Sequence, residues 1–243
     1  MVTVLGAIKE FLHGNISGIT RSTASIFFLV LIALMTAVHL YDSWKDNDSE
    51  RARTKPFLLI FVTLYYMFAV PEPSWLLVFA LSFSWMGDVL LIPKGHGWFT
   101  AGGISFMLSH FLFIAVYVTR IDFQKVSWGL VIPVALIYYA VAAVVIFNVQ
   151  PTTPKPMVVP MYIYLLANST MNTFALMQLC SNRSLGAWVA FIGAILFFIS
   201  DCTLFLVRYY KNKNLIFKRH FTVMATYVIG EFLITQGIIM LTL

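Results

Sequence analysis

The sequence predicts an all-α fold, a polytopic transmembrane helical bundle of about eight spans. Hydrophobic residues make up 60% of the 243 residues and charged residues only 11%, with a mean hydropathy of +0.86. A soluble domain carries about a quarter charged residues. The charges gather in short clusters between apolar runs, each about as long as one bilayer crossing, ~17–25 residues. The ~10-residue alternating strands typical of a membrane β-barrel do not occur in the sequence.

The first half of the chain is divided into an N-terminal segment, residues 1–23, and four predicted spans. A histidine, a glycine and an asparagine at positions 13–15 interrupt the N-terminal segment, so we expect no cleavable signal peptide. Proline ends a helix and restricts the residue before it. Pro71-Glu72-Pro73 therefore separates the second span from the third, and Pro93 closes the third. We expect these spans at 24–41, 56–71, 74–92 and 98–119.

The second half contains four more predicted spans, at 128–149, 157–179, 186–207 and 220–242. Residues 24–243 thus form a single integral membrane domain. Lys-Pro opens both the span at 56–71 and the span at 157–179, and the segments 87–91 and 200–204 are similar. Both pairs lie four spans apart, as a parallel duplication of a four-helix unit would place them. Two short matches also arise by chance in apolar sequence.

The distribution of lysine and arginine predicts the orientation. The face with both termini carries five of these residues, whereas the opposite face carries eleven, in 42–55, 93–97, 150–156 and 208–219. Because cytosolic loops carry the excess of positive charge, we expect the second face to be cytosolic.

Two aspartates lie within the predicted spans, where a charge is expensive and marks a candidate functional site. Asp88 follows Ser84 on the same helical face, and Asp201 follows Ser200. Both spans run toward the predicted cytosolic face, so the two carboxyl groups should lie at a similar depth. We therefore predict a shared site. The alternative is that each aspartate only joins helices through hydrogen bonds.

Other polar residues within the spans have two interpretations each. Glu231 shares a stripe with Tyr227 and acts either as a structural hydrogen-bond partner or in catalysis. Tyr164, Asn168 and Asn172 form a second stripe, which either lines a headgroup pocket or binds a neighbouring helix.

Two basic side chains are also ambiguous. His110 is either an acid, base or orienting group or a packed hydrogen-bond donor. Lys55 lies on the aspartate side, where it holds a phosphate or merely anchors its helix at the interface.

Several classes of function find no support in the sequence. The histidines and cysteines are not spaced as metal ligands, and no P-loop, dinucleotide fingerprint or nucleophile elbow occurs. The net charge of +6 lies in loops, which suits topology and anionic lipid headgroups. A nucleic-acid partner would require a basic patch on a recognisable fold. We expect no metal, no cofactor and no nucleic acid, with the lipid bilayer as the main partner.

A series of short motifs extends over residues 55–234. It begins with Lys55-Pro56, Ser84-x-x-Gly87-Asp88-x-x-Leu91 and Gly103-x-Ser105-Phe106-x-x-Ser109-His110. It continues with Pro160, Tyr164, Gly193-Ala194-x-Leu196-Phe197-x-x-Ser200-Asp201-x-x-Leu204 and Tyr227. In this order the motifs resemble the YhhN-like membrane proteins, a family that includes the lysoplasmalogenases. One departure is Glu231, which stands where the family usually has glutamine.

The resemblance implies hydrolysis of the vinyl ether bond of lysoplasmalogens to a fatty aldehyde and glycerophosphoethanolamine or glycerophosphocholine. Such a reaction suits one carboxylic acid and one carboxylate, here Asp88 and Asp201. The remaining polar residues would contact the substrate: Lys55, Ser84, His110, Tyr164, Asn168, Ser200, Tyr227 and Glu231. An enzyme of this kind is expected in the endoplasmic reticulum or another internal membrane. The alternatives are a transporter or proton-coupled carrier that uses the same carboxylates, and a lipid-binding scaffold.

Overall fold

The computed structural model describes residues 18–212 and 214–243, so most of the predicted N-terminal segment lies outside the described residues. Within them the chain forms eight α-helices, one 3-10 helix and no strand, which confirms the all-α fold class. The elements are α2 (Gly18–Trp44), α3 (Asp48–Ala69), α4 (Trp75–Leu90), α5 (His96–Val118), α6 (Trp128–Val149), η1 (Gln150–Thr152), α7 (Lys155–Ser181), α8 (Leu185–Tyr209) and α9 (Arg219–Thr242).

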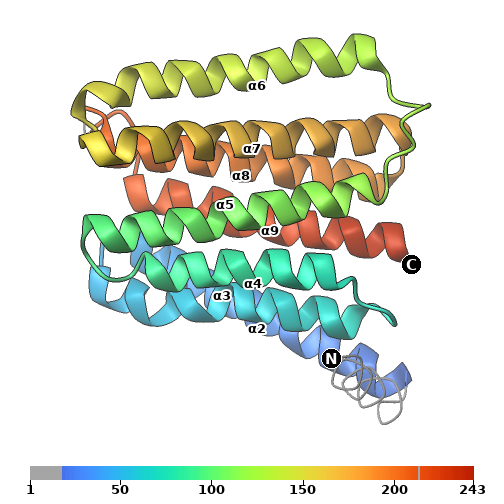
Figure 1. Ribbon diagram of the computed structural model, residues 1–243. Coiled ribbons are helices and arrows are strands. Elements are labelled where there is room, and N and C mark those ends of the chain that lie inside the picture. The colour runs from blue at the N-terminus through green and yellow to red at the C-terminus, as the bar shows by residue number, and fades with distance from the viewer. Residues whose placement is uncertain (1–17, 213) are drawn as a thin grey trace, which may run out of the picture.

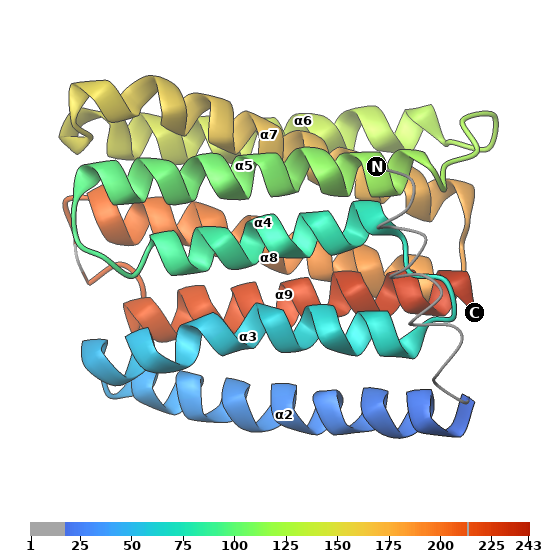
Figure 2. The ribbon, with the colours of Figure 1, turned by 60° about the horizontal axis from the view of Figure 1, so that its bottom comes forward.

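The helices lie side by side in one bundle, with connections that alternate between its two ends (Figures 1 and 2). Helix α2 begins and α9 finishes at the same end. Helices α2 and α6 lie at opposite sides of the bundle (Figure 1), and most of the buried side chains belong to the helices between them. The candidate site described below is built from these helices between α2 and α6.

Helix α3 begins at Asp48, before the start that was predicted for the second span at residue 56. The side chain of Asn47 accepts a hydrogen bond from the Glu50 backbone N–H, and two acidic residues in the first turn complement the helix dipole. These signals start the helix earlier, and it continues through Pro56 despite the missing N–H. The helix therefore carries Lys55 in its second turn, facing α4.

Helices α8 and α9 approach closely because glycines face each other. A Cβ atom on Gly193 would lie 2.5 Å from the backbone nitrogen of Ile234, and one on Gly237 would lie 2.4 Å from that of Ala190. Any larger residue would force the two backbones apart. Gly193 thus admits α9 beside α8, and this contact fixes the height of Asp201 relative to α9.

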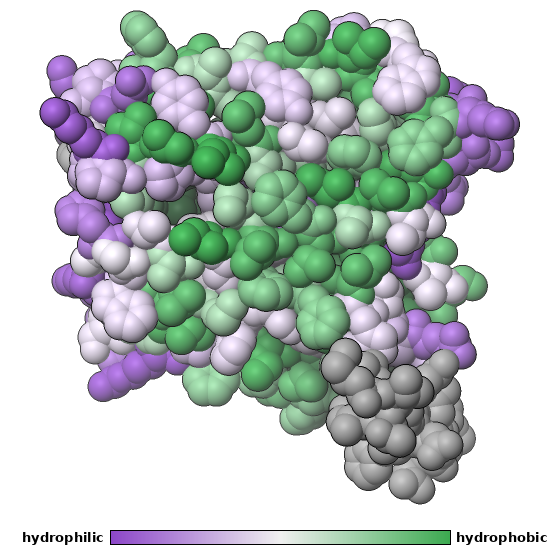
Figure 3. All heavy atoms as spheres, in the orientation of Figure 1, coloured by the Kyte–Doolittle hydropathy of each residue, from purple (hydrophilic) through white to green (hydrophobic). Residues whose placement is uncertain are grey.

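The outer surface is suited to lipid. A hydrophobic band covers the middle of the visible face, and hydrophilic residues lie at both ends (Figure 3). Among the described residues, five helices are long and apolar enough to cross a membrane, namely those at Arg21–Trp44, His96–Val118, Trp128–Thr152, Leu185–Tyr209 and Arg219–Thr242. The protein is thus an integral membrane protein.

The prediction of about eight spans exceeds this count of five. Trp75–Leu90 is apolar but shorter. Helix α3 begins with a charged turn, and α7 carries a buried polar stripe, which lowers the apolar content of both. All eight helices nevertheless belong to the same bundle.

The ends of the bundle provide a test of the predicted orientation. Residues 48 and 212 are exposed at the end where α3 and α5 begin, and Asn182 is exposed at the opposite end. Cysteines introduced at Asp48 and Asn212 should react with a membrane-impermeant reagent applied from the cytosol, whereas one at Asn182 should not. The reverse labelling pattern would invert the orientation.

Candidate active site

Asp88 and Asp201 line one buried cavity of about 200 Å3. Asp88 lies in the last turn of α4, and Asp201 lies on α8 about two turns before its end. The two residues are only 1% and 4% exposed. Both helices run toward the same end of the bundle, which explains why residues at a similar depth meet one cavity. The structure brings the two aspartates together as the sequence predicted, and their chemical role stays a prediction.

Both oxygens of Asp88 have partners from other helices. Lys55 on α3 places its Nζ 3.2 Å from Oδ1, and the Tyr227 hydroxyl on α9 donates to Oδ2 at 2.7 Å. The Lys55 side chain is only 15% exposed, so the pair is largely enclosed. A buried carboxylate is tolerated when a cation and hydrogen bonds satisfy it. Because ammonium and phenol groups both donate here, this surrounding suits a carboxylate.

Asp201 has a different arrangement, in which three side chains converge on a single oxygen. The Tyr164 hydroxyl and the Asn168 amide each donate to Oδ2 at 2.8 Å. His110 on α5 lies with its Nε2 3.3 Å from the same oxygen, and its ring stacks on Phe197 at 4.9 Å. Among the described residues, the hydrogen bonds and the ion pair of Asp201 all involve Oδ2 and none involves Oδ1. This oxygen is therefore the one available to a proton or a substrate.

The polar stripe on α7 positions the Asn168 amide. Asn172 donates from Nδ2 to Oδ1 of Asn168 at 3.0 Å, one turn away. Because this bond occupies the amide oxygen of Asn168, its NH2 group is directed at Asp201. The stripe thus binds a neighbouring helix at Asn168, and Tyr164 also faces the apolar groove described below.

Glu231 lies outside the aspartate cavity. Ser84 donates to its Oε1 at 2.6 Å and lies 2.7 Å from the Ser109 hydroxyl. These fully buried side chains join α4, α5 and α9. Neither Ser84 nor Glu231 lines the cavity, so the structure does not bring these predicted substrate contacts to the aspartates.

Glu231→Gln provides a prediction from this arrangement. Glutamine can still accept from Ser84, and it is the residue that the YhhN-like pattern usually has. We expect turnover to change by less than about tenfold, the equivalent of one ordinary hydrogen bond. Kinetics of the purified variant test this, and a loss as large as that of an aspartate variant would place Glu231 in the chemistry.

The remaining cavity wall is mainly apolar and aromatic. The Phe106 ring lies 5.7 Å from that of Tyr227, and Leu91 and Leu204 complete the lining near the aspartates. Ser200 also lines the cavity, but its hydroxyl donates to the Val223 carbonyl at 2.9 Å. The apolar part of this lining suits a hydrocarbon group.

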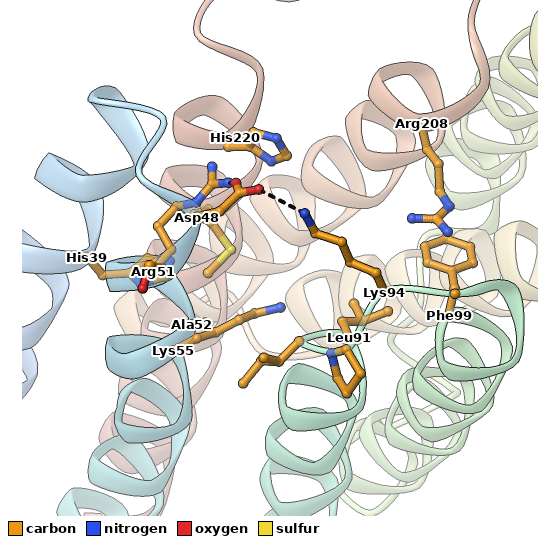
Figure 4. A pocket seen from close by; sticks show the side chains of 15 residues that line it. His39, Asp48, Arg51, Ala52, Lys55, Leu91, Lys94, Phe99, Arg208 and His220 are labelled. Atoms are coloured by element: carbon orange, nitrogen blue, oxygen red, sulfur yellow. Dashed lines mark hydrogen bonds and ion pairs between the residues drawn. The ribbon is translucent and has the colours of Figure 1, made fainter.

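A larger basic space, which we term the vestibule, opens beside the cavity at the lysine- and arginine-rich end (Figure 4). Its volume is about 610 Å3, and it shares Lys55, Phe99 and Arg208 with the aspartate cavity. Arg51 and Lys94 add two further cations. Figure 4 shows Lys94 reaching across from the loop after α4 toward Asp48 on α3, with 3.6 Å between the charged atoms. Cations thus surround the route to the aspartates.

Sequence reasoning missed the vestibule, although helical spacing contained a signal. Arg51 lies four residues before Lys55 and therefore on the same face of α3, and Arg208 lies seven residues after Asp201 on α8. His39 received no role from sequence, yet it lines the vestibule, with its Nδ1 2.7 Å from the Thr54 hydroxyl. Nothing in the local sequence of His39 shows that α2 packs there.

Asp48 is the acidic residue that lines the vestibule. Desolvation alone would raise the pKa of this carboxyl, but the nearby charges of Arg51 and Lys94 outweigh that effect and hold the pKa below its usual value. Asp48 is therefore charged at neutral pH and pairs with two of the vestibule cations. An anionic ligand would have to compete with it.

An apolar groove lies between α5 and α7 on the membrane-facing side. It has a volume of about 170 Å3, and its lining includes Gly103, Ile104 and Met161. Phe99 lines this groove, the vestibule and the aspartate cavity alike. The three spaces therefore meet at one phenylalanine.

Within the described residues no group of three or more potential metal ligands occurs.

No curated protein and no solved structure matches the chain. The YhhN family matches residues 50–238, a stretch that contains Lys55, Asp88 and Asp201. This match covers most of the chain, and the protein therefore belongs to the YhhN family.

Proposed function

We propose that this protein is a lysoplasmalogenase, which hydrolyses the vinyl ether bond of a lysoplasmalogen to a fatty aldehyde and glycerophosphoethanolamine or glycerophosphocholine. The observation that carries the proposal is the pairing of two unequal carboxyl groups in one buried cavity. Asp88 is bound by a cation and a phenol, whereas the hydrogen bonds and ion pair of Asp201 within the described part of the chain all reach Oδ2 and leave Oδ1 without one. An acid and a base of the same residue type require such different surroundings.

In the proposed reaction Asp201 acts as the acid and Asp88 as the base. Asp201 delivers a proton to the β-carbon of the vinyl ether, and the α-carbon becomes an oxocarbenium ion. Water adds to that carbon while Asp88 accepts a proton, which gives a hemiacetal. Asp88 then protonates the glycerol oxygen as its bond to carbon breaks, and Asp201 takes the hemiacetal proton. The aldehyde leaves with both carboxyl groups in their starting states.

The neighbouring side chains support this division of roles. Lys55, 3.2 Å from Asp88, keeps a positive charge beside the carboxylate that must act as a base. Tyr164 and Asn168 hold Oδ2 of Asp201, so that only Oδ1 is left to carry the proton. The negative Asp88 also stabilises the oxocarbenium ion electrostatically. General acid–base groups of this kind typically contribute ~10²–10⁴-fold each.

Turnover by purified protein tests the proposal. The substrates are a vinyl ether lysolipid, its ester analogue and its saturated alkyl ether. The proposed mechanism consumes the vinyl ether alone, because only that bond can accept a proton on carbon. Turnover of the ester would indicate an acyl hydrolase. A counter-flow signal in vesicles without any turnover would favour the carrier.

A further inference from the structure

The groove between α5 and α7 has the features of a binding site for one hydrocarbon chain. Its walls are built from apolar parts of the side chains of both helices. Ile104 and Ile163, which line it, are about half exposed, 48% and 46%, and they belong to the hydrophobic outer surface. Figure 3 shows the surface hollowed at this place, between the first halves of α5 and α7 as labelled in Figure 1.

The groove adjoins the proposed site at two aromatic residues. Tyr164 lines the groove and donates its hydroxyl to Asp201, so a chain in the groove lies against the ring that binds the carboxyl group. Phe99 lies where the groove, the aspartate cavity and the vestibule meet. The Arg208 guanidinium covers the Phe99 ring at 3.7 Å, and it also lines the vestibule.

We infer that a single-chain phospholipid enters sideways from the bilayer, with its chain in the α5–α7 groove and its phosphate in the vestibule. This inference rests on the proposed function for the choice of lipid. A groove of about 170 Å3 is close to the size of an apolar cavity that holds one benzene molecule, about 150 Å3, so it takes part of one chain and not two. The charge of the vestibule suits an anionic phosphate, which would lie near Lys94 and Arg208.

Gly103 allows the groove to be filled without disturbing the fold. A Cβ atom on Gly103 would have nothing within 4 Å, although the residue lines the groove. Gly103→Leu therefore places a side chain in the space where the chain would lie. Gly129 on α6 is a matched control, because a Cβ atom there also meets nothing within 4 Å and the residue does not line the groove. Both changes replace a helical glycine by a good helix former.

The test is photolabelling of the purified full-length protein with an alkyl-ether lysophosphatidylcholine that carries a diazirine in its chain. This probe has no vinyl ether, so its binding is measured without turnover. We expect labelling of α5 and α7 residues in the groove, among them Met107 and Met161, and competition by unlabelled lysolipid. Each buried methylene contributes about fourfold to an affinity, so Gly103→Leu should lower the labelling at least about tenfold, while Gly129→Leu should leave it unchanged.

The outcomes separate this inference from the proposed function. The inference is overturned if a two-chain phospholipid displaces the label as well as a lysolipid does, or if Gly103→Leu leaves the labelling intact. Either result would show ordinary contact with bilayer lipid. If the groove is labelled as expected but no vinyl ether is hydrolysed, the chain site stands and the proposed activity fails. If the vinyl ether is hydrolysed but the groove is not labelled, the proposed activity stands and the chain site fails.

Discussion

Asp88→Asn and Asp201→Asn are each expected to lower turnover of a vinyl ether lysolipid by about 10²–10⁴-fold. Asparagine keeps the size of the side chain but can neither deliver the proton nor accept one. At position 88 the amide also removes the charge that faces Lys55, and at position 201 it removes the oxygen that would carry the proton. Steady-state kinetics of the purified variants provide the measurement.

Asp122→Asn is the matched control for both aspartate variants. Asp122 is an exposed loop residue that pairs with Lys125 at 2.9 Å, in a loop between α5 and α6. Its replacement should leave turnover unchanged, and all three variants should retain the helical circular dichroism spectrum. If either cavity variant keeps more than about a tenth of wild-type turnover, that aspartate is not an acid–base group on this scale.

Lys55→Met is expected to have the next largest effect, because it leaves Asp88 as a buried carboxylate without its cation. Breaking a buried ion pair from one side costs about 3–5 kcal/mol. We therefore expect a lower unfolding temperature together with a loss of turnover. Because Lys55 is paired with Asp88, we expect the loss to be similar for a phosphate-bearing lysolipid and for a neutral alkenylglycerol.

A double variant separates the pair from other roles of Lys55. Lys55→Met combined with Asp88→Asn should regain most of the unfolding temperature, since neither charge is then left alone, but it should stay inactive. Lys155→Met is the control, as it changes the exposed lysine of the other Lys-Pro dipeptide. A larger rise in KM for the phosphate-bearing substrate alone would instead show that Lys55 binds the phosphate.

Sequence alone predicted the membrane bundle and its two buried aspartates, because both follow from local composition and helical direction. Asp88 and Asp201 stand out as charges in apolar runs, and counting helices places them at one depth. The Lys55–Asp88 pair could not be predicted, since it depends on how α3 packs against α4. Helix α3 extends beyond the predicted span of residues 56–71 because Asn47 caps it and Pro56 does not end it.

The position of the groove depends entirely on tertiary packing, and so does the question of which polar residues within the spans reach an aspartate. Glu231 and Asn168 look alike in sequence, as polar residues in the middle of a span. Only the packing of α7 on α8 directs Asn168 to an aspartate, while Glu231 faces Ser84 on α4. In the same way, nothing in the sequence distinguishes Gly103, which faces open space, from Gly193, which lies against a backbone.

The predicted four-helix repeat agrees with how the aspartates are held. Asp88 has one partner on the preceding helix, Lys55, and one on α9, Tyr227. Asp201 likewise has Tyr164 on the preceding helix and His110 on α5, which is four helices from α9. Each aspartate thus has one partner on a helix from the other half of the chain. The repeat itself stays a prediction.

Proton transfer to carbon is the central step of the proposed mechanism, and hydrolysis in D2O measures it directly. The enzyme is allowed to act on a vinyl ether lysolipid, the aldehyde is reduced at once to the alcohol, and the product is analysed by mass spectrometry. The mechanism predicts one deuterium on the carbon next to the former carbonyl, and a glycerophospho product that takes no 18O from labelled water. An aldehyde without deuterium at that carbon, or 18O in the glycerol hydroxyl, would contradict it.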